Sequence, residues 1–158
     1  MTKTRLSVLF ACVAVLVLST VPAADSASRG FDPSTWLQDS GGMFDAIRSV
    51  EEESKPMVVY FYTDWCGYCR QFERELLGTE EVKEYFSEVL AVRINPENGD
   101  REREIAAYYG VTGYPGFFVH SGTSRTLSRV DRMLVENGQP RLMAPEEFIA
   151  ACRRAASR

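Results

Sequence analysis

The sequence lacks an excess of positive charge, internal repeats and low-complexity tracts. Its 158 residues carry a formal net charge of −4, which argues against a surface for nucleic acid or anionic membranes. With 45% hydrophobic and 25% charged residues, the composition is that of a globular protein that can bury a core. We therefore expect one domain with an N-terminal appendage, which acts as a monomer and binds no nucleic acid.

The sequence also lacks an apolar run of the roughly 20 residues that a membrane-spanning helix needs. The continuous apolar stretch over residues 6–21 is 16 residues long, follows Lys3 and Arg5, and precedes the small residues of "VPAADSA". A basic start, an apolar centre and a small-residue cleavage site are typical of a secretory signal peptide. We expect residues 1–24 to be a cleaved signal peptide and the protein to be periplasmic or secreted. The alternative is that the uncleaved segment anchors the protein.

Cysteine and histidine are scarce. Removal of residues 1–24 leaves Cys66, Cys69 and Cys152, together with the single histidine His120. Structural zinc needs four ligands, haem attachment needs a histidine after CxxC where this chain has Arg70, and iron–sulfur clusters need more thiolates. These absences argue against a metal site or a bound cofactor, although copper(I) held by two thiolates stays open.

Apolar runs alternate with helical periodicities along the rest of the chain. Residues 25–42 are polar and turn-rich, so we expect a linker or N-terminal arm before a domain over residues 43–158. Helices are expected from Met43, from the cysteine pair with Thr63 or Asp64 as its cap, from Thr79, from Asp100 and from Pro145. Strands are expected at residues 57–62, 89–94, 116–120 and 125–130. Residues 131–143 are expected to form a long loop. This order predicts an α/β fold with a central mixed β-sheet and helices on both faces.

The cysteine pair of "DWCGYCRQFE" lies where the first of these strands ends and a helix begins. Backbone N–H groups at a helix N-terminus lower the pKa of a thiol. We expect an exposed Cys66 to attack as a thiolate, and Cys69, one turn deeper on the buried face, to resolve the mixed disulfide. A purely structural disulfide is weakly motivated, because a bridge over so short a loop constrains the unfolded chain little.

"DWCGYC" followed by "GYP" at residues 113–115 resembles the thioredoxin superfamily. Within it, "TDWCGYCRQFE" and "AYYGVTGYP" are similar to exported thioredoxin-like proteins and to the C-terminal periplasmic domain of DsbD-type thiol–disulfide reductases. The resemblance implies a thioredoxin-like fold with Cys66 as the nucleophile, Cys69 as the resolving cysteine, Trp65 as the flanking tryptophan and Pro115 as a cis proline that faces the disulfide. A proline there leaves the backbone of Tyr114 free to pair with an extended substrate strand.

Two positions depart from the thioredoxin pattern. Tyr60 stands where thioredoxins often have a buried aspartate that aids proton transfer, and a phenol is a poor base near neutral pH. Glu73 shares a helix face with both cysteines and matches a glutamate of DsbD-type domains, so it is the candidate substitute; the alternative is a solvated acid. Tyr68, between the cysteines, brings no cation to stabilise a thiolate, which argues against a very strong oxidant and favours a reductant or an intermediate potential. We expect Tyr68 to be exposed and to touch partners.

These features predict an exported thiol–disulfide oxidoreductase that reduces protein disulfides through a Cys66–Cys69 dithiol/disulfide cycle without a bound cofactor. Its partners would be disulfide-containing client proteins and an upstream dithiol donor, which is exported or embedded in the membrane. The alternatives are a disulfide oxidase or isomerase, and a non-enzymatic module that binds peptide or copper.

Overall fold

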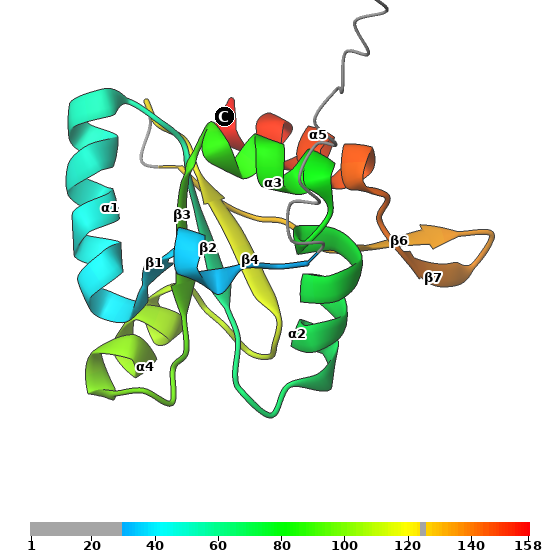
Figure 1. Cartoon of the computed structure of the whole chain (residues 1–158), viewed down its shortest axis with the longest axis horizontal. Coiled ribbons are helices and arrows are strands. Elements are labelled where there is room, and N and C mark those ends of the chain that lie inside the picture. Colours follow the sequence, from blue (N-terminus) through cyan, green and yellow to red (C-terminus); the bar gives the residue numbers. More distant parts are fainter. Residues whose placement is uncertain (1–29, 124–125) are drawn as a thin grey trace, which may run out of the picture.

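The computed structural model describes residues 30–123 and 126–158. A five-stranded sheet of order β1-β3-β2-β4-β5 lies at its centre (Figure 1). The neighbours β1, β3 and β2 are parallel, whereas β4 is antiparallel to β2 and β5 is antiparallel to β4. The strands are β1 Leu37–Gln38, β2 Met57–Phe61, β3 Leu90–Ile94, β4 Gly116–His120 and β5 Leu127–Arg129. The expected mixed sheet is thus confirmed.

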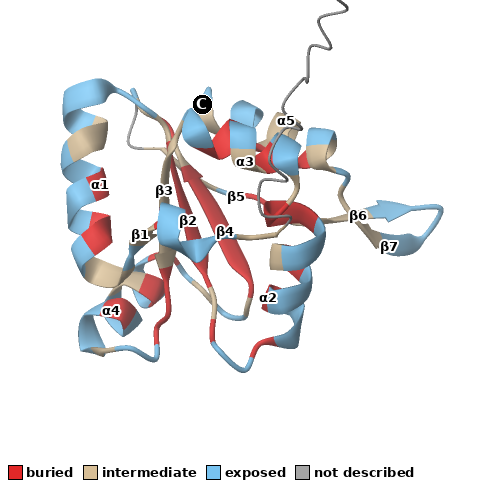
Figure 2. Ribbon diagram, viewed as in Figure 1, coloured by how far each residue is buried: buried red, intermediate tan, exposed pale blue. Residues whose placement is uncertain are grey.

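Helices cover both faces of this sheet (Figure 2). Strand β2 is buried along its whole length, and its side chains alternate between two apolar clusters, Tyr60 pointing to one and Phe61 to the other. The first cluster lies under α2 Gly67–Phe72, its π-helical continuation η2 Glu73–Leu77, α3 Glu80–Ser87 and α5 Pro145–Ala156. The second lies under α1 Asp39–Glu53 and α4 Asp100–Tyr108.

Residues 30–42, the described part of the expected linker or N-terminal arm, pack on the domain as part of its sheet and core. Within residues 30–42, a short 3₁₀ turn, η1 Pro33–Thr35, leads into β1, which pairs with β3. The Trp36 ring is buried and contacts Tyr60 and Phe86 edge-on. The polar composition hid this apolar anchor, and the domain begins before Met43. Residues 25–29 and the expected signal peptide at 1–24 lie outside the described residues.

The expected loop at residues 131–143 is wrong, because it contains a β-hairpin. Strands β6 Met133–Glu136 and β7 Gln139–Leu142 pair antiparallel and form a separate two-stranded sheet. Asn137 and Gly138 join them with φ values of 52° and 78°, the left-handed conformation that a two-residue Asn-Gly turn adopts. The hairpin projects from the body of the domain, at the right of Figure 1.

Candidate active site

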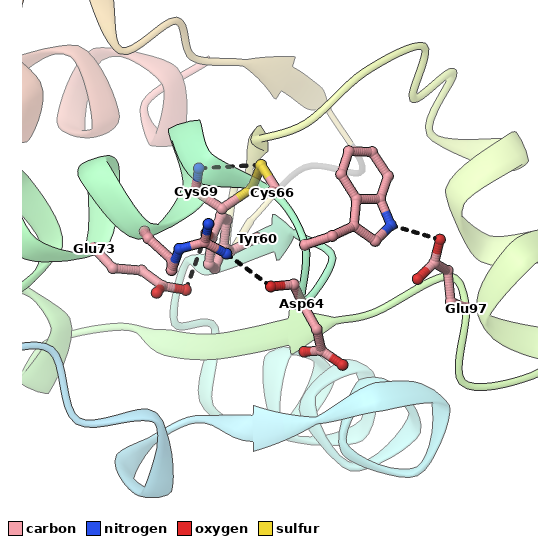
Figure 3. The surroundings of a disulfide bond; sticks show 8 residues. Tyr60, Asp64, Cys66, Cys69, Glu73 and Glu97 are labelled. Carbon is pink, nitrogen blue, oxygen red and sulfur yellow. Dashed lines mark hydrogen bonds between the residues drawn. A yellow bond between two sulfur atoms is a disulfide. The ribbon is translucent and has the colours of Figure 1, made fainter.

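The two cysteines form a disulfide at the start of α2 (Figure 3). Their Cα atoms are 5.2 Å apart. Cys66 is the N-cap residue of the helix, and its Sγ accepts a hydrogen bond of 3.1 Å from the backbone N–H of Cys69. This N–H is positioned to stabilise negative charge on the Cys66 sulfur once the disulfide is reduced.

The expectation of an exposed Cys66 is wrong for the disulfide form. Cys66 is only 4% exposed and Cys69 1%, because both pack in the apolar cluster that contains Tyr60 and Phe72. A partner's sulfur can therefore reach the disulfide only at the small part of its surface that is exposed to solvent.

The flanking aromatic side chains lie on the surface, as expected for Tyr68. Trp65 and Tyr68 are each 66% exposed. Each of these residues directly precedes a cysteine of the buried disulfide and offers exposed aromatic surface that a partner can contact.

Glu73 occupies the inner side of the same helix, one turn beyond Cys69. Its carboxylate is half-buried and accepts a 3.1 Å hydrogen bond from the hydroxyl of Tyr60, which is fully buried on β2 (Figure 3). Burial raises the pKa of Glu73, and the hydrogen bond from Tyr60 opposes that rise. Burial and the nearby Glu73 charge also raise the pKa of Tyr60, so the phenol stays protonated and acts as a donor. Glu73 is thus a partly desolvated carboxylate rather than a fully solvated one.

The cis proline and the flanking tryptophan lie on neighbouring segments. The Tyr114–Pro115 peptide bond is cis, as the sequence predicts. The Trp65 ring meets the Tyr114 ring edge-on, with centroids 6.2 Å apart. Its indole N–H donates a 2.9 Å hydrogen bond to Glu97, a residue that sequence reasoning missed because no motif marks it.

A second missed residue is Arg132, in the connection between β5 and β6. Its guanidinium carbon lies 5.5 Å from the centroid of the Tyr68 ring, within the range of a cation–π contact. The Asn-Gly pair at residues 137–138 was the signal that would have revealed the hairpin and hence a fixed position for Arg132.

The remaining thiol, Cys152 on α5, does not belong to this site. It is fully buried, and burial raises its pKa to about 12, so it stays a protonated, inert thiol. A hollow of about 830 Å³, lined by residues that include Phe44, Ile47 and His120, contains neither Cys66 nor Cys69. Within residues 30–123 and 126–158, no group of three or more histidine, cysteine or acidic side chains is arranged to hold a metal ion, and no helix is long and apolar enough to cross a membrane.

Comparison with known proteins shows which family has this arrangement of the cysteine pair and the sheet. The sequence model of one protein family, described as a thioredoxin-like domain, matches residues 43–131, more than half of the chain. The chain belongs to the thioredoxin-like domain family. Together, this membership and the Cys66–Cys69 disulfide support thiol–disulfide oxidoreductase chemistry.

Relatives of this thioredoxin-like protein include much longer chains. It is 34% identical over 85 residues to protein disulfide-isomerase 1 of Dictyostelium discoideum, covering 52% of this chain and 22% of the relative. It is 27% identical over 105 residues to the thiol:disulfide interchange protein DsbD of Actinobacillus pleuropneumoniae, covering 60% of this chain and 18% of the relative. The chain thus spans about a fifth of the length of these two relatives.

Solved structures agree with the fold. The oxidised C-terminal domain of Neisseria meningitidis DsbD superposes with a TM-score of 0.57 at 23% identity, covering 76% of this chain and 98% of that domain. A thioredoxin from Thermus thermophilus superposes with a TM-score of 0.55 at 19% identity, covering 75% and 85% of the two chains. The expected thioredoxin-like fold is therefore confirmed.

Proposed function

We propose that the protein is an exported thiol–disulfide oxidoreductase that reduces disulfides of client proteins. The observation that carries the proposal is the Cys66–Cys69 disulfide at a helix start, with the Cys69 N–H aimed at the Cys66 sulfur. Export rests on the signal-peptide pattern of residues 1–24. The electron source would be a dithiol donor that is itself exported or embedded in the membrane.

The first step forms a mixed disulfide. In the reduced protein, the Cys66 thiolate attacks one sulfur of the client disulfide, a Cys66–client S–S bond forms, and the client S–S bond breaks. The released client thiolate takes a proton from solvent. The Cys69 N–H and the other free amides of the first helical turn stabilise Cys66 as the thiolate.

The second step releases the client. Cys69 loses its proton and its thiolate attacks the Cys66 sulfur, so the Cys66–Cys69 bond forms and the Cys66–client S–S bond breaks. The second client sulfur leaves as a thiolate that takes up a proton, and the client now holds both electrons. Burial of Cys69 disfavours a free thiolate, so a nearby base has to take its proton. We assign that role to Glu73, whose raised pKa makes it a better proton acceptor than a fully solvated carboxylate.

The contacts around the disulfide favour a reductase over an oxidase. Strong oxidants stabilise the reduced, thiolate form of the pair. Here Tyr68 itself carries no charge, the Arg132 guanidinium lies over the Tyr68 ring, and the Arg70 guanidinium donates to the backbone carbonyl of Asp64. Trp65, Tyr114 and Pro115 would form the surface along which an extended client segment lies.

A turnover assay tests this function. The mature protein should catalyse insulin reduction by dithiothreitol, Cys66→Ser should abolish this activity, and the matched control Cys152→Ala should retain it. Cys69→Ser should trap mixed disulfides at Cys66, which mass spectrometry would identify. If both Cys66→Ser and Cys69→Ser retained the activity, the proposal would be refuted.

The reduction potential tests the direction. Reductases such as thioredoxin have potentials of about −270 mV, whereas a strong oxidant has about −120 mV. Equilibration with glutathione should place the Cys66–Cys69 pair nearer the first value. A potential near the second would mean that the protein oxidises its partners, and inactivity towards insulin with retained peptide binding would favour a non-enzymatic module.

A further inference from the structure

The segment that joins β5 to the β6–β7 hairpin lies beside the candidate active site, at the end of the family match. That match ends at residue 131, and the whole hairpin follows it. The connecting residues share a small hollow with the cis proline, lined by Pro115, Phe117, Arg129, Val130, Asp131 and Arg132. A client segment that runs along Pro115 would therefore pass this connection.

Arg132 differs from the other arginines of this region in its charge partners. Arg129 pairs with Asp131 at 3.7 Å, and Arg141 pairs with carboxylates of Glu136 and Glu147. Among the residues that the structure describes, Arg132 has no carboxylate partner and lies over the Tyr68 ring. In a chain of net charge −4, this places an unpaired positive charge next to Tyr68, one of the two residues between the cysteines.

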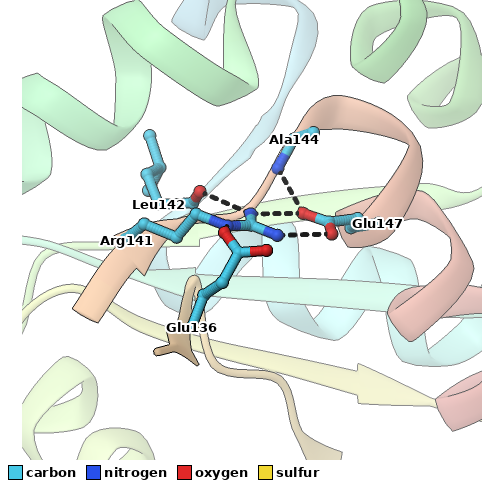
Figure 4. A network of polar contacts seen from close by, with 5 residues as sticks. All are labelled: Glu136, Arg141, Leu142, Ala144 and Glu147. Carbon is cyan, nitrogen blue, oxygen red and sulfur yellow. Dashed lines mark hydrogen bonds and ion pairs between the residues drawn. The ribbon is translucent and has the colours of Figure 1, made fainter. Parts of the chain in front are cut away.

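The base of the hairpin holds the backbone of Arg132 in place, and the side chains that tie this base to α5 are drawn in Figure 4. The Met143 N–H donates a 2.8 Å hydrogen bond to the Arg132 carbonyl. Two residues earlier, Arg141 donates two hydrogen bonds, of 2.6 and 2.7 Å, to the Glu147 carboxylate at the start of α5. The guanidinium holds the pKa of Glu147 down to about 2, so the pair stays ionised at neutral pH. Because the backbone of Arg132 is already fixed, less conformational entropy is lost when its side chain binds a partner.

We propose that Arg132, held over Tyr68, selects partners that carry an aspartate or glutamate beside the reacting cysteine. This inference rests on the proposed exchange activity and adds a substrate class to it. A guanidinium can keep one face on an aromatic ring while its N–H groups bind a carboxylate in a two-pronged contact. An acidic neighbour of the client cysteine would make that contact, whereas a basic neighbour would be repelled.

The test uses three disulfide-bonded peptides of equal length whose cysteine is flanked by Glu, Ser or Lys. Rate constants for their reaction with the reduced mature protein are divided by those for dithiothreitol, which corrects for the intrinsic reactivity of each peptide. We expect the Glu peptide to react about tenfold faster than the Lys peptide at low salt, and the ratio to fall as salt rises.

Two variants of Arg132 and one control variant show whether Arg132 causes the preference for the Glu peptide. Arg132→Gln should bring the Glu/Lys ratio close to one, and Arg132→Glu should invert it. Arg154→Glu makes the same change in net charge at an exposed site on α5, and it should keep the wild-type ratio. Circular dichroism checks that each variant is folded.

The outcomes separate the two proposals. If the wild type reacts with none of the peptides, the proposed exchange activity is wrong. If it reacts with all three at equal corrected rates, or if Arg154→Glu changes the ratio as much as Arg132→Glu does, only the role of Arg132 is overturned.

Discussion

Removing the Tyr60 hydroxyl would test whether the buried side of α2 prepares Glu73 for proton transfer. Tyr60→Phe keeps the ring that packs against Trp36 and Phe72 and deletes the 3.1 Å hydrogen bond to Glu73. Such bonds contribute about 0.5–1.5 kcal/mol between neutral groups and about 1.5–3 kcal/mol to a charged group. Because Glu73 is half-buried and solvent replaces part of the bond, we expect the free energy of unfolding at pH 7 to fall by about 1–2 kcal/mol.

The same substitution should change the pH dependence of the reaction. The Tyr60 hydrogen bond lowers the pKa of Glu73, so its removal should raise that pKa further. If Glu73 accepts the Cys69 proton, the rise of the resolving rate with pH should move to higher pH in Tyr60→Phe. Stopped-flow decay of a mixed disulfide at Cys66 measures that rate, and urea unfolding measures the stability.

A matched variant separates this effect from a general loss of stability. Tyr109 belongs to the cluster on the other face of the sheet, and Tyr109→Phe deletes a hydroxyl that forms a hydrogen bond with His120. It should lower stability but leave the pH profile of the resolving step in place. Identical profiles for Tyr60→Phe and the wild type would refute the proton-transfer role of Glu73.

Two further changes follow from the same structure. Burial raises the folded-state pKa of Glu73, so its contribution to stability is full below the unfolded pKa and is lost as pH rises through the folded pKa. The stability of Glu73→Gln relative to the wild type should therefore increase from pH 4 to pH 7 in urea unfolding. Gly122→Ala places a Cβ 2.0 Å from the Ser54 carbonyl oxygen and should cost about 1–3 kcal/mol or more in thermal unfolding. Gly41→Ala on exposed α1 has no atom within 4 Å of its Cβ and should gain up to about 1 kcal/mol; equal effects at the two glycines would contradict the packing at Gly122.

The elements that could be predicted from the sequence are those with a strong local pattern. Strands β2, β3 and β4 coincide with apolar runs that are rich in β-branched and aromatic residues. Strand β1 could not be predicted, because two residues carry no periodicity and become a strand only by pairing with β3. The β6–β7 hairpin could have been predicted, since its Asn137-Gly138 turn is a strong local signal.

The site shows the same division between local and tertiary information. Helical spacing was enough to place Glu73 on the face of the cysteines. Its hydrogen bond with Tyr60, however, joins residues that are 13 positions apart and belong to different elements. The burial of Cys66 likewise depends on how α2 packs on the sheet. Such contacts depend on how helices and strands pack together, so the sequence of a single helix or strand does not reveal them.

The first turn of α2 separates the chemistry of the reaction from the recognition of partners. Successive helical residues point about 100° apart, and here Cys69 is 1% exposed whereas Tyr68 is 66% exposed. The proton-handling group Glu73 lies on the inner side, and Arg132 lies over the outer side at Tyr68. Because no hydrogen bond, ion pair or ring contact joins Glu73 to Tyr68 or Arg132 within the described residues, we expect Glu73 variants to shift the pH profile equally for every partner. Arg132 variants should instead change the ranking of partners at any single pH. A Glu73 variant that altered the Glu/Lys peptide ratio would show that the two sides are coupled through the disulfide itself.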